Sequence, residues 1–147
     1  MQERGKEFGA TTGRPRRCGW FDGVLVRYAT RVNGLTSLAV TKLDVLDGCQ
    51  EVKLCTGYRL GGKLYKDMPS DLAVLQECEP VYQVMPGWST ATTGITAYKS
   101  LPARAKRYLD RIQELADCRI DIISTGSRRD ETIMLRNPMR PTRRRRK

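Results

Sequence analysis

The fold is decided by the stretch LTSLAVTKLDVLDG, Leu35 to Gly48, in which an apolar run ends on charged residues. The apolar residues between Leu35 and Val40 follow a glycine and precede an aspartate-glycine pair, which is typical of a short buried strand. In open α/β sheets, ligands bind beyond the carboxyl ends of the strands. We therefore expect Thr41, Lys42 and Asp44 to stand at a ligand site.

The side chains at this strand end favour a guanine base. Asp44 can accept parallel hydrogen bonds from N1–H and the exocyclic amino group of guanine, whereas adenine carries an acceptor at N1. Lys42 has a long methylene stem that can lie along a base while its ammonium group stays in water or on a ring oxygen. Four-residue patterns also recur by chance, so a solvated strand end is the alternative interpretation.

The segments on either side of this stretch alternate between helical and extended patterns. Apolar residues at helical spacing predict a helix within Trp20–Asn33, ended by Gly34. Alternation over Glu51–Leu60 predicts a strand, and the glycine turn that follows it leads into Leu64 and Tyr65. These two extended segments are expected to form a hairpin.

The second half of the chain continues the alternation. A short helix is expected over Pro69–Leu75, followed by a strand over Val81–Met85. Ser100 and Pro102 predict the cap and first turn of a longer helix. The apolar face of that helix comprises Ala105, Tyr108, Leu109, Ile112, Leu115 and Ala116.

A second apolar strand ends on small polar residues. Ile120–Ile123 reads as a buried strand that stops at the turn Ser124–Gly126, again at a carboxyl end where ligands bind. Glu131–Leu135 predicts a last strand. Helices and strands alternate, so we expect an α/β fold. Residues 1–139 are expected to form one domain, and residues 140–147 a basic, disordered tail.

The positive charge of the chain is concentrated at its end. The formal net charge is +11, and six of those charges lie in the last eight residues, which leaves +5 for residues 1–139. A tail of this kind attaches weakly to polyanions, with strong salt dependence. It lacks the aromatic residues that stack on bases, so a basic nucleic-acid-associated protein is a minor alternative.

Composition excludes several classes of protein. The five cysteines include no C-x-x-C pair, which favours neither a zinc site nor a disulfide framework. No apolar run approaches the roughly 18 residues of a membrane span, so we expect no membrane association and a cytoplasmic protein. The chain contains no histidine, which excludes a Ser-His-Asp triad or a histidine general acid within it.

A polar loop near the N-terminus has the composition of an anion site. The segment Glu7–Trp20 combines threonines, glycines and arginines without hydrophobic periodicity. Gly13 and Pro15 predict a rigid turn, which would bring the two threonine hydroxyls toward Arg14. Arginine offers a planar fork of donors to carboxylate or phosphate oxygens. A solvated basic loop is the alternative interpretation.

Taken together, these segments resemble a known protein family. The motifs that carry the resemblance, in order, are ATTGRPRRCGWFD, NGLTSLAVTKLDVLDG, EVKLC, PVYQVMPGW, YLDRIQELADCRIDIISTG and ETIMLRNP. Together they look like the carboxyl-terminal third of adenylosuccinate synthetase, over about Gly5 to Pro138. The resemblance implies a P-loop NTPase-like fold, with a mostly parallel central sheet, helices and a small antiparallel insertion.

The resemblance also implies an activity. Enzymes of this family use GTP and magnesium to join IMP and L-aspartate into adenylosuccinate, with release of GDP and phosphate. GTP first phosphorylates the 6-oxygen of IMP, and the aspartate amine then displaces that phosphate. The family generally forms homodimers.

Family roles transfer to matching positions only. The residues that would bind aspartate are Ala10, Thr11, Thr12, Gly13, Arg14, Pro15 and Arg16. Of these, Arg14 would also reach IMP and Arg16 the GTP side. The residues that would bind GTP are Arg16, Lys42, Leu43, Asp44, Ser124, Thr125 and Gly126.

Two departures from the family pattern stand out. Ser127 occupies a position where the family usually has proline, so that side of the base pocket is expected to be looser. The family's phosphate loop, catalytic aspartate and catalytic histidine belong to its amino-terminal region and are absent from this sequence. We therefore expect a fragment without catalytic or metal-binding residues, inactive alone, with magnesium held mainly by the amino-terminal region. A guanine-nucleotide-binding remnant without ligase activity is the alternative.

Overall fold

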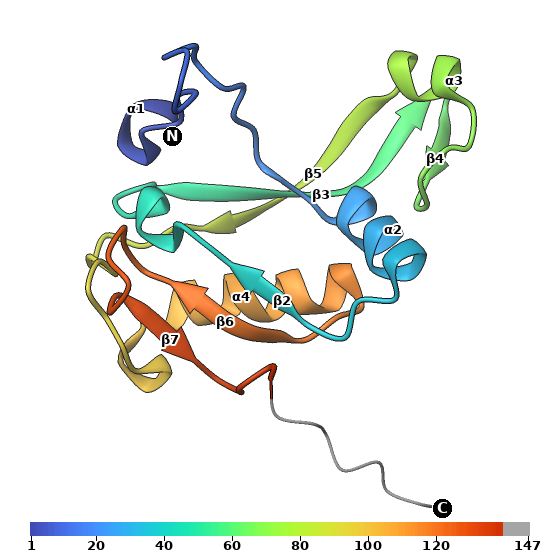
Figure 1. Ribbon diagram of the computed structural model, residues 1–147. Helices are drawn as coiled ribbons and strands as arrows, with labels where there is room; N and C mark the ends of the chain where they lie inside the picture. The colour runs from blue at the N-terminus through green and yellow to red at the C-terminus, as the bar shows by residue number, and fades with distance from the viewer. Residues whose placement is uncertain (140–147) are drawn as a thin grey trace, which may run out of the picture.

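The computed structural model describes residues 1–139, which form helices and two small sheets (Figure 1). The elements are α1 (Gln2–Gly5), β1 (Phe21–Asp22), α2 (Gly23–Asn33), β2 (Leu38–Val40), the 3-10 helix η1 (Leu43–Leu46), β3 (Glu51–Leu60), β4 (Lys63–Tyr65), α3 (Leu72–Glu77), β5 (Glu79–Pro86), the 3-10 helix η2 (Tyr98–Ser100), α4 (Ala103–Ala116), β6 (Ile120–Ser124) and β7 (Thr132–Met134). The alternation of helices and strands confirms the α/β class.

Both sheets are mixed. In the first sheet β1 pairs parallel with β3, whose other partners β4 and β5 are antiparallel. In the second, the order is β2-β6-β7, with β2 parallel and β7 antiparallel to β6. Within residues 1–139 the antiparallel component is thus larger than the small insertion we expected. For β4 and β7 the reason is local, because the hairpin from β3 to β4 and the loop from β6 to β7 are too short for parallel crossovers. Strand β5 pairs antiparallel with β3 after the chain returns through β4 and α3.

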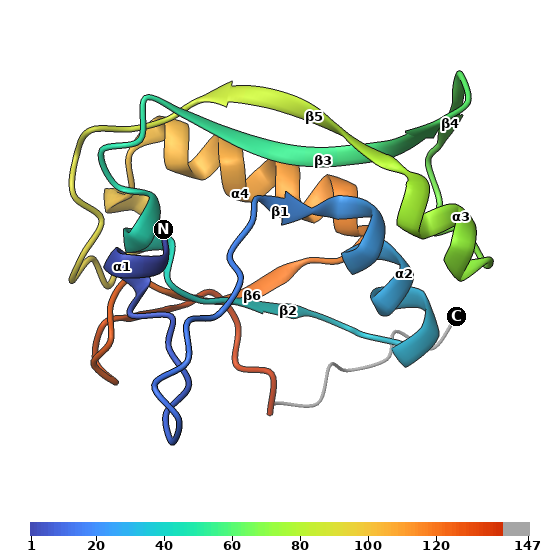
Figure 2. The same ribbon diagram turned by 90° about the horizontal axis from the view of Figure 1, so that it is seen from above.

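Helix α4 lies between the two sheets and supplies the centre of the core (Figure 2). All six residues of its predicted apolar face are buried. All of them except Ala116 belong to one core cluster with Val52 and Leu54 of β3 and Ile120 and Ile123 of β6. The predicted cap at Ser100 is wrong. That residue belongs to η2 and the helix begins three residues later, too far for its hydroxyl to reach the first-turn N–H groups.

Helix α2 starts later than the periodicity suggested, because Asp22 caps it. The Oδ1 atom of Asp22 accepts hydrogen bonds from the N–H groups of Val24 and Leu25, both at 3.0 Å. Its Oδ2 atom accepts a 2.6 Å hydrogen bond from the hydroxyl of Tyr58. As predicted, Gly34 ends the helix in the left-handed conformation, with φ of 60°.

Strand β2 is shorter and more exposed than predicted. It covers only Leu38–Val40, and these residues are half-buried or exposed because, within residues 1–139, β2 is an edge strand that pairs with β6 alone. Its register shifts between Leu38 and Ala39, after which Val40 lies opposite Ile123. Since β2 and β6 run parallel, the segments that follow them leave the same edge of the sheet. This arrangement positions the candidate site.

Candidate functional site

The two predicted ligand-binding segments meet at one cavity. Lys42 and Asp44, which follow β2, line a cavity of about 470 Å³ together with Gly126, which follows β6. Arg4 from α1 and Glu131, which immediately precedes β7, line the same cavity. The parallel pairing of β2 with β6 therefore places the predicted guanine-reading residues side by side.

Asp44 presents a free carboxylate oxygen at this cavity. Its Oδ1 atom is buried and has no hydrogen-bond partner among residues 1–139. Burial raises the pKa of Asp44, and the neighbouring carboxylates of Asp47 and Glu131 add to this effect. Buried polar atoms in native proteins are almost always hydrogen-bonded. A buried acceptor without a partner is therefore available to a donor on a ligand.

Lys42 adopts an uncommon backbone conformation beside Asp44. Its φ is 61°, in the left-handed region that residues other than glycine seldom occupy. Its ammonium group donates a 2.7 Å hydrogen bond to the carbonyl oxygen of Gly5 and forms an ion pair with Glu7. Leu43, which follows it, is only 1% exposed, so its side chain belongs to the core and anchors η1.

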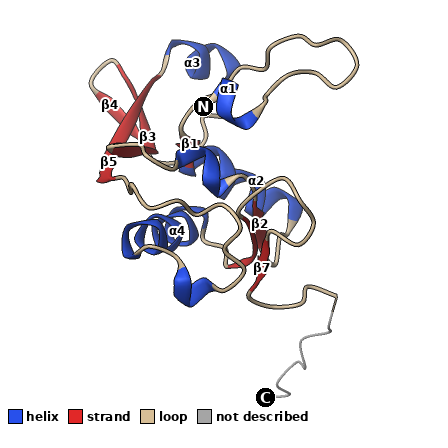
Figure 3. Cartoon of the chain, turned by 90° about the vertical axis from the view of Figure 1, so that its left-hand side faces the viewer, coloured by secondary structure: helices blue, strands red, loops and turns tan. Residues whose placement is uncertain are grey.

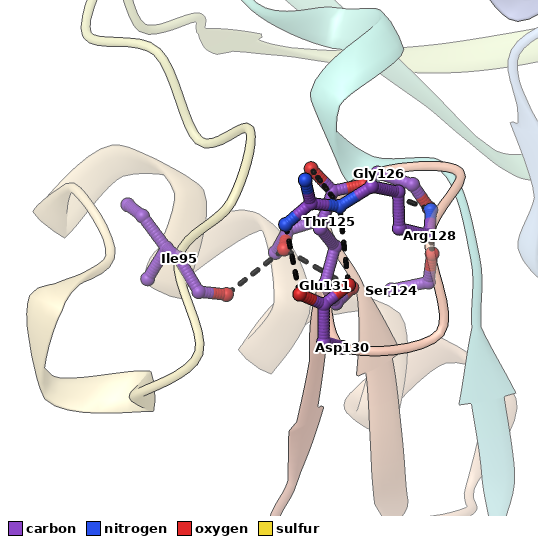
Figure 4. Close-up of polar contacts among 7 residues, drawn as sticks. All are labelled: Ile95, Ser124, Thr125, Gly126, Arg128, Asp130 and Glu131. Atoms are coloured by element: carbon purple, nitrogen blue, oxygen red, sulfur yellow. Dashed lines mark hydrogen bonds and ion pairs between the residues drawn. The ribbon is translucent and has the colours of Figure 1, made fainter.

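The turn after β6 is held by internal hydrogen bonds (Figure 4). The hydroxyl of Thr125 donates to the carbonyl oxygen of Ile95 at 2.9 Å, and its N–H donates to the carbonyl oxygen of Glu131 at 3.0 Å. The hydroxyl of Ser124 donates to the carbonyl oxygen of Gly126 at 2.8 Å. Thr125 is fully buried, so its side chain shapes the turn and does not face the cavity.

Gly126 lies directly beneath the carboxylate of Glu131. A Cβ atom at position 126 would lie 2.2 Å from Oε2 of Glu131, far inside contact distance. The same Oε2 atom accepts a 2.8 Å hydrogen bond from the N–H of Arg128 (Figure 4). The glycine therefore allows the Glu131 carboxylate to fold over the turn.

A half-buried carboxylate that the sequence did not single out braces the site. Asp47 accepts hydrogen bonds from Nε1 of Trp88 at 2.7 Å and from the N–H and hydroxyl of Thr92 at 2.6 and 2.8 Å. Three residues after Thr92, the carbonyl oxygen of Ile95 accepts a hydrogen bond from the hydroxyl of Thr125. The segment 88–95 thus ties the end of η1 to the turn after β6. The sequence pattern indicates only that Asp47 belongs to an Asp-Gly turn.

The polar loop near the N-terminus forms an irregular hairpin that projects from the molecule (Figure 2, Figure 3). Phe8 and Pro15 form an isolated antiparallel bridge, and the N–H of Gly9 donates to the carbonyl oxygen of Arg14 at 2.8 Å. Gly13 has φ of 63°, which fits the predicted turn. All residues of Ala10–Arg16 are exposed.

Only the end of this loop is linked to the cavity residues. Arg16 forms an ion pair of 3.3 Å with Glu7, and Glu7 also pairs with Lys42. Lys42, Asp44 and Gly126 thus line one cavity, whereas Arg16 lines a neighbouring cavity that it shares with Lys42, and Ala10–Pro15 line neither.

Some site types find no support in the described part of the chain. Residues 1–139 contain no group of three or more histidine, cysteine, aspartate or glutamate side chains that could hold a metal ion. No helix in this range is long and apolar enough to cross a membrane.

Comparison with known proteins places the chain in a family. A family model described as adenylosuccinate synthetase matches residues 1–133. The chain belongs to the adenylosuccinate synthetase family. Similar relatives are the adenylosuccinate synthetases of Geotalea uraniireducens (strain Rf4) and Geobacter metallireducens, each 54% identical over 138 residues. The match covers 94% of this chain but 32% of each relative, so the chain spans about a third of their length.

A solved structure supports the same relationship. The fully ligated adenylosuccinate synthetase from Plasmodium falciparum superposes with a TM-score of 0.84 at 34% sequence identity. The similarity covers 90% of this chain and 32% of that chain. The adenylosuccinate synthetase resemblance and its fold are therefore confirmed. The individual residue assignments stay predictions, with Leu43 and Thr125 placed to support the cavity and not to line it.

Proposed function

We propose that this chain forms the guanine- and aspartate-recognising part of an adenylosuccinate synthetase. The enzyme would use GTP to join IMP and L-aspartate into adenylosuccinate, with release of GDP and phosphate. Family membership supports the reaction, and the cavity between the ends of β2 and β6 supports the role of this chain in it.

One observation carries the assignment of guanine, the free buried oxygen of Asp44. A carboxylate that accepts from N1–H and the 2-amino group of guanine gains two charge-assisted hydrogen bonds. Adenine would turn its N1 lone pair toward the same carboxylate and leave it unpaired, which costs affinity. Lys42 would lie along the base, and Gly126, the residue of the turn Ser124–Gly126 that lines the cavity, would close the opposite side.

We assign recognition of the aspartate carboxylates to the projecting loop Ala10–Arg16. Its exposed hydroxyls and the guanidinium groups of Arg14 and Arg16 are the donors that such oxygens prefer. Arg14 would also reach IMP. Because Arg16 already lies close to Glu7 and Lys42, it would connect the loop to the GTP side of the site.

We assign no catalytic residue and no magnesium ligand to this chain. Its sequence offers no histidine, and no carboxylate cluster within residues 1–139 fits a metal ion. Magnesium would neutralise phosphate charge during the reaction. A homodimer and a cytoplasmic location are part of the proposal, and the five free thiols fit a reducing compartment. Weak nucleic-acid binding through residues 140–147 lies outside the described residues.

The direct test is nucleotide binding by the 147-residue chain, measured by isothermal titration calorimetry. We expect GDP to bind and ADP to bind far more weakly. Asp44→Asn should weaken GDP binding by about 1.5 to 3 kcal/mol, the range for a hydrogen bond to a charged group. Asp117→Asn is the matched control, since it removes the same charge from an exposed helix end that tolerates asparagine.

Three outcomes would separate the alternatives. Equal affinity for GDP and ADP would overturn the guanine assignment. GDP binding that neither IMP nor L-aspartate affects would favour a nucleotide-binding remnant. Binding that falls steeply with salt and disappears when residues 140–147 are deleted would favour the nucleic-acid-associated alternative.

A further inference from the structure

Glu7 connects the two predicted subsites, although the sequence did not single it out. One carboxylate oxygen pairs with the ammonium group of Lys42, and the other accepts a hydrogen bond of 3.3 Å from the guanidinium group of Arg16. The carboxylate is mostly covered, with 23% of the side chain exposed. Lys42 belongs to the guanine site and Arg16 to the projecting loop, so one side chain contacts both.

The backbone of Glu7 is fixed from both sides. Its carbonyl oxygen accepts a 2.8 Å hydrogen bond from the N–H of Arg16, which closes the base of the projecting loop. Its own N–H donates to the carbonyl oxygen of Gln2 at 3.0 Å. The hydrogen bond from Lys42 lowers the pKa of Glu7, so the carboxylate is charged at neutral pH. Glu7 is thus a rigid anion at the junction of the loop and the cavity.

Lys42 needs such an anchor. A left-handed conformation at a residue other than glycine is costly, and it persists only where surrounding contacts enforce it. The other two such residues within 1–139, Lys6 and Asp117, follow the last residue of a helix, where this conformation is usual. Lys42 instead begins η1, and its ammonium group is held by Glu7 and the carbonyl oxygen of Gly5.

The anchored side chain stands between two cavities. Lys42 lines both the cavity of about 470 Å³ that contains Asp44 and a neighbouring cavity of about 410 Å³ that contains Arg16. With its ammonium group fixed, its methylene stem becomes a fixed wall of the guanine cavity. A free lysine would first have to lose rotamer entropy before it could lie along a base.

We propose that Glu7 is a positioning residue for nucleotide recognition, which fixes Lys42 against the guanine base and ties Arg16 and its loop to the same site. This inference rests on the proposed function. Glu7 does not contact the nucleotide, and it acts by holding two residues that do. The consequence is that guanine affinity depends on a carboxylate outside the guanine cavity.

A double-mutant cycle on the 147-residue chain tests the inference, with GDP and ADP affinities as the readout. Glu7→Gln should weaken GDP binding about fivefold, within the range for coupled neighbouring residues, and leave ADP binding unchanged. Glu3→Gln, the matched control, removes the same charge from exposed α1 and should have no effect. In a Lys42→Met background, Glu7→Gln should reduce GDP affinity by only a small part of this factor, because the ammonium group that pairs with Glu7 is absent.

The results separate this inference from the proposed function. If the unmodified chain does not distinguish GDP from ADP, the proposed function fails. If it does, but Glu7→Gln and Glu3→Gln behave alike, only the positioning role is overturned. A full effect of Glu7→Gln in the Lys42→Met background would also overturn it. Should Glu7→Gln not fold, by circular dichroism, the reversed pair Glu7→Lys with Lys42→Glu takes its place. Recovery of GDP affinity above that of Lys42→Glu then supports the role, and no recovery refutes it.

Discussion

The carboxylate of Asp47 accepts two hydrogen bonds from Thr92, one from its N–H at 2.6 Å and one from its hydroxyl at 2.8 Å. Thr92 is fully buried, and both contacts lie next to the 3-10 helix that carries Asp44. The position of the Asp44 carboxylate, proposed to bind guanine, is therefore coupled to a segment that follows β5 rather than to neighbours in the chain.

The first prediction concerns this coupling. Thr92→Val keeps the volume of the side chain but removes one of the hydrogen bonds to Asp47, so we expect the free energy of unfolding to fall by about 1 to 3 kcal/mol. Urea denaturation followed by tryptophan fluorescence measures the change. Thr96→Val makes the same substitution at an exposed position and should have little effect. Equal effects of the two variants would contradict the role of Asp47 as a brace.

The second prediction separates stability from binding at Asp44. Burial raises the pKa of its carboxyl group, so the charged form costs stability at neutral pH. Asp44→Asn should therefore raise the free energy of unfolding by roughly 0.5 kcal/mol or more while it weakens GDP binding.

The pH dependence of this effect has a definite sign. The pKa of Asp44 is higher in the folded protein than in the unfolded chain. The free energy of unfolding therefore rises as the pH falls through the folded-state pKa toward the pKa of an ordinary aspartate. The increase in the free energy of unfolding caused by Asp44→Asn should thus be largest at neutral pH and become smaller under acid conditions. Denaturation curves across this pH range would refute the interpretation if the gain grew with acidification.

The third prediction concerns Gly126. An alanine there would displace the Glu131 carboxylate from its hydrogen bond with the N–H of Arg128 and distort the turn. We expect a loss of about 1 to 2 kcal/mol in stability together with weaker GDP binding. Gly19→Ala is the control, because a Cβ atom at that position meets no other atom within 4 Å. Unchanged GDP affinity in Gly126→Ala would show that the turn does not shape the base site.

The fourth prediction concerns the outer face of α2. Leu25, Tyr28 and Val32 are 46%, 42% and 64% exposed and lie along one side of the helix. Exposed apolar patches promote association. Leu25→Glu combined with Val32→Glu should reduce aggregation of the chain without loss of helix content, as measured by light scattering and circular dichroism. Thr36→Glu adds a negative charge at an exposed polar position, so an equal benefit from it would point to net charge as the cause.

The elements that the sequence predicts best are those with local signals. The predicted strand Glu51–Leu60 has the observed bounds, and every residue of the predicted apolar face of α4 is buried. Both depend on side-chain periodicity, which neighbours in the chain reveal. The cap of α4 was misjudged because a serine-proline pattern does not fix where the first turn begins. The exposure of β2 was missed because the number of strands beside it is a tertiary property.

The candidate site was predictable only in part. The two strand ends were expected to meet, and parallel pairing of β2 with β6 brings them together. Side-chain direction was not predictable, and Leu43 and Thr125 point into the protein. Glu7 and Asp47 contact partners 35 and 45 positions away, and such contacts leave no pattern in nearby sequence.

The register of β2 against β6 has a consequence for how the chain can tolerate changes in length. The irregularity between Leu38 and Ala39 lies upstream of the site, so a residue inserted before it can be absorbed where the pairing already slips. An insertion after Val40 would advance Asp44 along the strand direction by about 3.3 Å relative to Gly126. We therefore expect the predicted base site to be sensitive to an added residue between Val40 and Asp44, and less sensitive to one added before Leu38.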